Sequence, residues 1–250
     1  MKNNTPPSII ITTGKRMAGV SLVLKAILKD NVKTIHIQNP KISSKNFNYV
    51  ISPNHDNLNG DNIINSIGAL HHLNKNNQIT YQGLVTCIIG GDNQHYHFDN
   101  NEANELCNKL IEIKNNQKDI ELNIVTSRRT SDTVKNILIK KLKNIAKIWT
   151  GKGANPYIES IKKSSYFIVT SDSTSMISEA AVSGKPIYVY HLTFKRKSKR
   201  IENFHKEFSE LGITKDIIKF NHLSNWTYNP LNESERIAMI IKKRIIKENI

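Results

Sequence analysis

The chain has 250 residues, of which 38% are hydrophobic and 23% are charged. This composition excludes disordered and fibrous proteins and indicates a globular protein with one large or two ordinary domains. The apolar runs, such as Tyr166–Thr170 and Ile187–Tyr190, are far shorter than the roughly 20 residues of a membrane helix. The N-terminus lacks the apolar segment of a secretory signal, so we expect a cytoplasmic protein.

The formal net charge is +15, in a chain that is also rich in Asn and Ile. Lysine and arginine are scattered along most of the expected helices, and they form dense clusters only at Lys195–Arg200 and Lys242–Lys247. Such clusters are most simply solvated faces; contact with phosphate or with an anionic membrane surface is the alternative. That alternative would place the protein peripherally at the inner face of the membrane, through Lys195, Arg196, Lys197, Lys199 and Arg200. No nucleic-acid-binding module is recognisable, and no nucleic-acid partner is expected.

Hydrophobic periodicity in the first part of the chain predicts three strands and one helix. The strands are expected at Ser8–Thr12, Thr34–Ile37 and Tyr49–Ser52, and the helix at Ala18–Leu28. The polar stretch from Asn54 to Gln78 predicts a functional loop or a crossover between domains.

After this stretch, strands alternate with helices at the spacing of right-handed βαβ units. The expected strands are Val85–Ile89, Leu122–Thr126, Lys147–Trp149, Tyr166–Thr170 and Ile187–Tyr190. The expected helices are Glu102–Lys114, Asp132–Lys143, Pro156–Lys163, Thr174–Ser183 and Glu202–Leu211. This alternation predicts a doubly wound α/β domain with a parallel sheet.

The last segment, Ser234–Lys247, has isoleucines on one side and basic residues on the other, which predicts an amphipathic helix. Such a helix most often packs back on the domains, although an interfacial helix at a membrane has the same composition. We therefore expect an N-terminal domain over residues 1–80, a C-terminal domain over residues 81–230 and a packing helix over residues 231–250.

Ligands of open parallel sheets bind beyond the carboxyl ends of the strands. Gly90 and Gly91 follow one strand, where their N–H groups could face an anion, with a simple tight turn as the alternative. Arg128 and Arg129 follow the next strand. One of these two guanidinium groups could point into the cleft and bind phosphate.

The third polar strand end is the stretch TSDSTSMISEAAVSGKP from Thr170 to Pro186. Asp172, Ser173, Thr174 and Ser175 crowd a helix start, where one hydroxyl or carboxylate caps the helix and the others can hold oxygen-rich ligand groups. Glu179 follows about one turn later and could accept both hydroxyls of a ribose. The sequence therefore predicts a ligand-binding edge here.

Seven ordered motifs carry a family resemblance: HIQNP, NHDNLNG, GALHHL, IIGGDNQHYHFD, SRRT, WTGKGANPY and VTSDSTSMISEAAVSGKP. Over nearly the whole chain they resemble the mitochondrial fission family named after the plant elongated-mitochondria protein, in its bacterial branch. The resemblance implies a GT-B-like α/β fold, with two Rossmann-like parallel-sheet domains similar to those of glycosyltransferases and UDP-sugar 2-epimerases. Members of the family begin with an additional strand–helix unit, so the N-terminal domain is expected to be truncated.

Carried over position by position, the resemblance implies that a nucleotide diphosphate sugar is the ligand. The residues expected to bind it are Gly90, Gly91, Arg128, Arg129, Ser173, Thr174, Ser175 and Glu179. No cofactor is expected.

A sugar transferase would also need a base. His55 and Asp56 follow a strand end and are the catalytic candidates, since a histidine beside a carboxylate can accept a proton near neutral pH. His71 or His72 near the crossover is an alternative, and so is a simple turn at His55. His95 and His97 lack a third ligand, so no metal site is expected.

Three functions from different classes remain open. The first is a glycosyltransferase-like enzyme that uses a nucleotide sugar in cell-envelope synthesis. The second is a non-catalytic scaffold that keeps the fold, since fold alone does not determine turnover. The third is a peripheral membrane-surface protein that uses the basic cluster.

Overall fold

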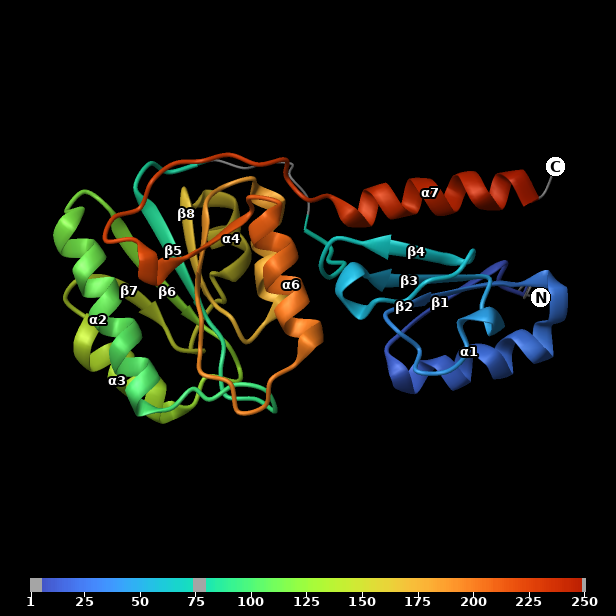
Figure 1. Cartoon of the computed structure of the whole chain (residues 1–250), viewed down its shortest axis with the longest axis horizontal. Helices are drawn as coiled ribbons and strands as arrows, with labels where there is room; N and C mark the ends of the chain where they lie inside the picture. Colours follow the sequence, from blue (N-terminus) through green and yellow to red (C-terminus); the bar gives the residue numbers. More distant parts are fainter. Residues whose placement is uncertain (1–5, 74–79, 249–250) are drawn as a thin grey trace. The chain divides into compact units, whose positions relative to one another are not determined.

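The computed structural model describes residues 6–73 and 80–248 and divides into two compact units (Figure 1). The first unit combines Met1–Leu70 with Glu233–Ile250, and the second is His71–Asn232. The chain therefore leaves the first unit after residue 70 and returns to it at residue 233. The final helix, which we expected to pack on the domains, belongs to the first unit.

The described residues of the first unit form a four-stranded parallel sheet in the order β1-β2-β3-β4. The strands are β1 (Ile9–Thr13), β2 (Lys33–Ile37), β3 (Tyr49–Pro53) and β4 (Ile63–Ser66). Helices α1 (Lys15–Leu28) and α7 (Glu233–Glu248) lie on opposite faces of this sheet (Figure 1). Short 3-10 turns occupy Lys29–Asn31, Ser44–Asn46 and Asn54–Asp56.

Strand β4 corrects the expectation that Asn54 to Gln78 is only a loop or crossover. Ile63 and Ile64 supply a two-residue apolar core to the strand, and Ile64 is aligned with Ile51 of β3. This pair is too short to stand out from the asparagines around it. Residues 74–79 of the same stretch lie outside the described residues.

Each face of the first sheet has its own apolar cluster. On the α1 side, the buried residues are Ala18, Phe47, Val50 and Ile63. On the α7 side, they are Ile35, Tyr49, Ile51, Ile64, Ile237 and Ile241. Glu233 fastens the start of α7, because its carboxylate accepts hydrogen bonds from the backbone N–H of Ile67 at 2.8 Å and from Arg236 at 2.6 Å.

In the second unit, the strands that the structure describes form a six-stranded parallel sheet in the order β10-β9-β8-β5-β6-β7. The strands are β5 (Leu84–Ile89), β6 (Glu121–Thr126), β7 (Ala146–Trp149), β8 (Tyr166–Thr170), β9 (Ile187–Tyr190) and β10 (Thr214–Asp216). The helices are α2 (Asn100–Asn116), α3 (Asp132–Leu142), α4 (Tyr157–Lys163), α5 (Thr174–Ala180) and α6 (Lys199–Glu210), with 3-10 turns at Ala181–Ser183 and Ile217–Lys219. The predicted alternation of strands and helices is confirmed, and β10 is an additional edge strand.

Both sheets are parallel throughout their described strands, which confirms the predicted class of two Rossmann-like α/β domains. In the second sheet, β5 pairs with β6 on one side and with β8 on the other. The direction of winding reverses at β5, and such a switch point is where open parallel sheets bind their ligands. In residues 6–73 and 80–248, no helix is both long enough and apolar enough to cross a membrane.

Candidate functional site

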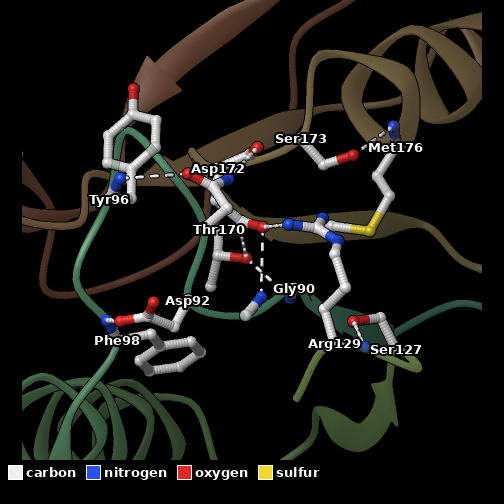
Figure 2. Close-up of polar contacts among 12 residues, drawn as sticks. Gly90, Asp92, Tyr96, Phe98, Ser127, Arg129, Thr170, Asp172, Ser173 and Met176 are labelled. Atoms are coloured by element: carbon white, nitrogen blue, oxygen red, sulfur yellow. Dashed lines mark hydrogen bonds and ion pairs between the residues drawn. The ribbon is translucent and has the colours of Figure 1, made fainter. Parts of the chain in front are cut away.

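The carboxyl ends of β5 and β8 meet at the switch point of the second sheet (Figure 2). The backbone N–H of Gly90 donates to Thr170 Oγ1 at 2.8 Å, and that of Gly91 donates to Asp172 Oδ2 at 3.1 Å. The N–H groups that we expected to face a ligand anion are thus bonded to side chains of the protein itself.

The close approach of other segments of the same chain, after β6 and β8, explains why both positions are glycine. A Cβ atom on Gly90 would lie 2.1 Å from Asp172 Oδ1, and a Cβ atom on Gly91 would lie 2.1 Å from the carbonyl oxygen of Arg129. Both separations are far below van der Waals contact. Any side chain at either position would therefore displace the loop after β6 or the carboxylate after β8.

Asp172 is the central anion of this junction, and its side chain is fully buried. Thr170 Oγ1 donates to Asp172 Oδ1 at 2.6 Å, and Arg129 Nη1 lies 2.7 Å from Asp172 Oδ2. Together with the bond from Gly91, these contacts satisfy a carboxylate that would be very costly to bury alone. Sequence reasoning placed Asp172 in the polar helix start but missed its partners, because they come from strands distant in sequence.

The two adjacent arginines have different environments. Arg129 forms the ion pair with Asp172, and its side chain is 40% exposed. Arg128 is exposed, and its side chain makes no hydrogen bond or ion pair with any residue in 6–73 or 80–248. Arg128 is therefore the arginine that is available to a ligand.

The start of α5 has the predicted cap. Ser173 is the N-cap residue, and its hydroxyl accepts a hydrogen bond from the backbone N–H of Met176 at 3.4 Å (Figure 2). Thr174 and Ser175 form the first turn, with Ser175 exposed. Gly184 ends the following 3-10 turn at φ 68°, a left-handed conformation that glycine commonly adopts at the end of a helix.

Glu179 lies near the end of α5 and is half-buried. The hydroxyl of Tyr157, the first residue of α4, donates a hydrogen bond to Glu179 Oε2. Burial raises the pKa of Tyr157 above its usual value, and the negative charge of Glu179 raises it further. The phenol therefore stays protonated and remains a donor. Tyr157 ends the sequence motif WTGKGANPY, which was the signal that could have identified it.

A histidine lies close to the same acid. His71 Nε2 and the carbonyl oxygen of Ser178 are 3.0 Å apart. Burial lowers the pKa of His71, whereas the charge of Glu179 acts in the opposite direction. In the part of the chain that the structure describes, Glu179 Oε1 accepts no hydrogen bond, so one carboxylate oxygen is available to a ligand.

The catalytic candidates lie in the first unit. His55 and Asp56 belong to the 3-10 turn Asn54–Asp56 that follows β3, with His55 buried and Asp56 half-buried. They are thus in a different unit from Glu179 and the glycine pair.

The basic cluster leads into α6. Lys195 forms an ion pair with Asp92, and the hydrogen bond within this pair lowers the pKa of Asp92. Arg196 and Lys197 are exposed, as are Lys199 and Arg200 in the first turn of α6. Among the residues described, no group of three His, Cys, Asp or Glu side chains gathers as a metal site requires.

The chain matches a known protein family over nearly its whole length. The family model for mitochondrial fission ELM1 matches residues 1–245. The chain belongs to the mitochondrial fission ELM1 family. This confirms the family that the seven motifs predicted.

Two relatives show how far the similarity extends. Mitochondrial fission protein ELM1 of Arabidopsis thaliana is 26% identical over 286 aligned residues, covering 96% of this chain and 64% of the plant protein. Uncharacterized protein RP120 of Rickettsia prowazekii (strain Madrid E) is 30% identical over 288 residues, covering 95% of this chain and 79% of that protein. This family member therefore spans less than two thirds of the plant protein.

Solved structures with a similar fold include UDP-GlcNAc 2-epimerases and MurG. UDP-GlcNAc 2-epimerase from Methanocaldococcus jannaschii matches with a TM-score of 0.59 at 15% identity, over 95% of this chain and 77% of that chain. The same epimerase in complex with UDP-GlcNAc and UDP matches with a TM-score of 0.53, at 15% identity and over 95% and 76% of the chains. MurG from Acinetobacter baumannii matches with a TM-score of 0.50 at 12% identity, over 85% and 61%. At these identities the likeness shows the fold alone, which is GT-B-like.

Proposed function

We propose that the second unit binds a nucleoside diphosphate sugar at the carboxyl edge of its sheet, with Glu179 accepting the ribose hydroxyls. The observation that carries the proposal is the hydrogen bonding of the Glu179 carboxylate. Tyr157 holds Oε2, while Oε1 accepts no hydrogen bond within the described residues. A half-buried carboxylate with an oriented, unused oxygen is suited to vicinal hydroxyls, because charged acceptors form the stronger hydrogen bonds.

The fold supports the choice of ligand. An epimerase with the same fold was solved in complex with UDP-GlcNAc and UDP. In this chain, the ribose hydroxyls of such a ligand would donate hydrogen bonds to Glu179. Its phosphates would accept hydrogen bonds from donor groups that have no partner within the described residues.

The diphosphate would be bound by Arg128 and by the hydroxyls of Thr174 and Ser175. The N–H groups of Gly90 and Gly91 are already bonded to the protein, so their role is to hold the junction and not to bind phosphate. Arg128 has no ion pair with the described residues, and an unpaired guanidinium can form a bidentate contact with phosphate.

Thermal unfolding of the full chain with UDP, GDP, CMP, dTDP and their sugars tests the proposal. A ligand present at 100 times its Kd stabilises the folded state by about 2.7 kcal/mol, which corresponds to roughly 5–10 °C for a domain of this size. One nucleotide class should give such a shift. Absence of a shift with every member of the panel contradicts the proposal.

Glu179→Ala provides the site-specific test. Loss of the acceptor should weaken binding by about 1–3 kcal/mol, or roughly 5- to 150-fold in Kd. Glu112→Ala is the matched control, because Glu112 is a half-exposed surface acid on α2 that pairs with Lys109. Equal affinity of the two variants would exclude Glu179 from the site.

The proposal extends to transfer of the sugar to an acceptor, with His55 and Asp56 as the base. The His55→Asn variant should keep the nucleotide-induced rise of the unfolding midpoint. It should no longer release the nucleotide from the sugar nucleotide. A wild-type chain that binds nucleotide but releases none with any acceptor would be a scaffold, the alternative function.

A second proposal concerns the basic cluster Lys195–Arg200. Its exposed cations at Arg196 and Lys197 favour contact with an anionic membrane, worth about 1 kcal/mol for each basic residue near the surface. Phosphatidylserine vesicles should bind the chain at low salt and release it at high salt.

Replacement of Arg196 and Lys197 by serine should weaken that binding. Replacement of the exposed Lys140 and Lys147 removes the same charge elsewhere on the second unit and should have little effect. Similar losses for both double variants would indicate nonspecific attraction.

A further inference from the structure

The second unit has a cavity of about 720 Å³ at the edge of its sheet opposite to the glycine junction. Its lining includes Leu84, Glu121 and Ala146, which are the first residues of β5, β6 and β7. Lys163, the last residue of α4, also lines it. The cavity therefore lies at the amino ends of the strands, whereas the nucleotide site proposed above lies beyond their carboxyl ends. Its volume is within the range of small-molecule pockets, about 300–1,000 Å³.

A row of polar side chains crosses the sheet at this cavity. The strand register aligns Thr86 of β5 with Asn123 of β6, and Asn123 with Lys147 of β7. The faces of a parallel sheet are normally apolar, because helices cover them. Here Thr86 Oγ1 is hydrogen-bonded to Ser164 Oγ at 2.6 Å, and Asn123 Nδ2 donates to Ser160 Oγ at 2.9 Å. The row therefore faces α4 and its C-cap.

Asn123 keeps one polar group for a ligand. Its amide nitrogen is bonded to Ser160, and both residues line the cavity. Its Oδ1 atom accepts no hydrogen bond from any residue in the described ranges 6–73 and 80–248. A side-chain amide oxygen accepts from hydroxyl donors. The wall of the cavity thus has an acceptor suited to a ligand hydroxyl.

The lining has an excess of positive charge. It includes four lysines and two glutamates: Lys114, Lys143, Lys147, Lys163, Glu121 and Glu159. Glu159 pairs with Lys163 at 3.2 Å, and Glu121 pairs with Lys147 at 3.7 Å. The second pair is weak, because its side chains are 71% and 85% exposed. Lys114 and Lys143 form no ion pair within the part of the chain that the structure describes.

Helix dipoles account for only one of these lysines. A cation near the C-terminus of a helix is favourable, and Lys114 in the last turn of α2 donates to the carbonyl oxygens of Lys118 and Ile120. Lys143 is the C-cap of α3, but its ammonium group bonds to no carbonyl oxygen among the described residues. Lys147 belongs to a strand. Lys143 and Lys147 are therefore available to an anion.

We propose that this cavity binds a sugar phosphate, with the phosphate on Lys143 and Lys147 and a sugar hydroxyl on Asn123 Oδ1. Ammonium groups bind phosphate as point charges. Leu84 and Ile145, which also line the cavity, would contact the carbon atoms of the sugar. Inorganic phosphate would leave the amide oxygen unused, and a neutral sugar would leave the two lysines unused. A sugar phosphate uses both kinds of group.

Calorimetric titration of the full chain with glucose 6-phosphate, glucose and inorganic phosphate tests the proposal. Glucose 6-phosphate should bind about tenfold more tightly than either of the other two. Lys143→Gln and Lys147→Gln should each weaken its binding by roughly 5- to 20-fold, since each removes a charged hydrogen-bond donor. Lys219→Gln is the matched control, because Lys219 is an exposed lysine of the second unit outside the cavity. Circular dichroism of each variant checks that it is folded.

Two measurements separate this cavity from the nucleotide site. Glu179→Ala and Arg128→Ala should keep the affinity for glucose 6-phosphate, whatever they do to nucleotide binding. Acetylation by acetic anhydride, followed by mass spectrometry, should be slower at Lys143 and Lys147 in the presence of glucose 6-phosphate and unchanged at Lys219. Loss of binding in the Glu179 or Arg128 variant would place the sugar phosphate at the carboxyl edge and refute the second site.

Other outcomes also overturn the proposal. Absence of binding by glucose 6-phosphate refutes it. Inorganic phosphate that binds as tightly refutes the role of Asn123, and glucose that binds as tightly refutes the role of the lysines. An equal loss of affinity in Lys219→Gln would show nonspecific attraction to a basic surface.

Discussion

Truncation of the two neighbouring arginines at the switch point should have different effects on the stability of the second unit. Arg129 faces the fully buried carboxylate of Asp172 at 2.7 Å, whereas Arg128 is exposed and has no partner among the residues that the structure describes. Arg129→Ala should therefore destabilise the second unit, and Arg128→Ala should leave its stability unchanged.

The expected loss of stability depends on how deeply each partner of the ion pair is buried. Breaking a fully buried ion pair costs about 3–5 kcal/mol, and an exposed pair is worth about 0–1 kcal/mol. Arg129 is 40% exposed, and Asp172 keeps its hydrogen bonds from Gly91 and Thr170. We expect a loss of about 1.5–3 kcal/mol for Arg129→Ala and less than about 0.5 kcal/mol for Arg128→Ala.

Urea unfolding followed by tryptophan fluorescence measures this directly, because both tryptophans, Trp149 and Trp226, lie in the second unit. With an m-value of about 1–3 kcal/mol per molar urea, the midpoint for Arg129→Ala should fall by roughly 1 M. Arg128→Ala should keep the midpoint and lose the nucleotide-induced shift. Equal midpoints for the two variants would refute the assignment of Arg129 to Asp172.

Three further predictions concern single sites. Gly91→Ala should destabilise the second unit by roughly 3 kcal/mol, because its Cβ would meet the backbone oxygen of Arg129; a fluorescence midpoint equal to wild type would contradict this. Burial lowers the pKa of His36, so the unfolded chain binds the proton first and stability should fall as the pH drops from 7 to 5. Circular dichroism during urea unfolding should show a shallower pH dependence for His36→Gln, and an unchanged slope would exclude this histidine as a cause. Tyr157→Phe should weaken nucleotide binding severalfold in calorimetry by releasing Glu179; unaltered affinity would show that the phenol does not orient the acid.

Sequence reasoning succeeded where local patterns determine structure. The alternation of strands and helices in the second unit follows from hydrophobic periodicity. A hydroxyl of the cluster before α5, that of Ser173, caps the helix as expected, because a hydroxyl directly before a helix satisfies its first N–H groups. Ser131 caps α3 in the same way.

It failed where a residue depends on a partner distant in the chain. The short, polar β10 becomes a strand because it can pair with the edge of β9. Gly91 is bonded to Asp172, 81 residues further along, and only the pairing of β5 with β8 brings them together. No local pattern reveals that the N–H of Gly91 is already occupied, so the anion-binding interpretation was natural from the sequence alone.

The return of the chain to its first unit at residue 233 affects the order of folding during synthesis. The second unit is continuous in sequence, so all of its strands emerge from the ribosome before α7 does. The first sheet, by contrast, waits for Ile237 and Ile241 to cover Ile35, Ile51 and Ile64. Until then an apolar face of β2, β3 and β4 stays open to solvent, and such surfaces attract chaperones and promote aggregation. We therefore expect nascent chains that lack the last helix to contain a folded second unit joined to an incomplete first one.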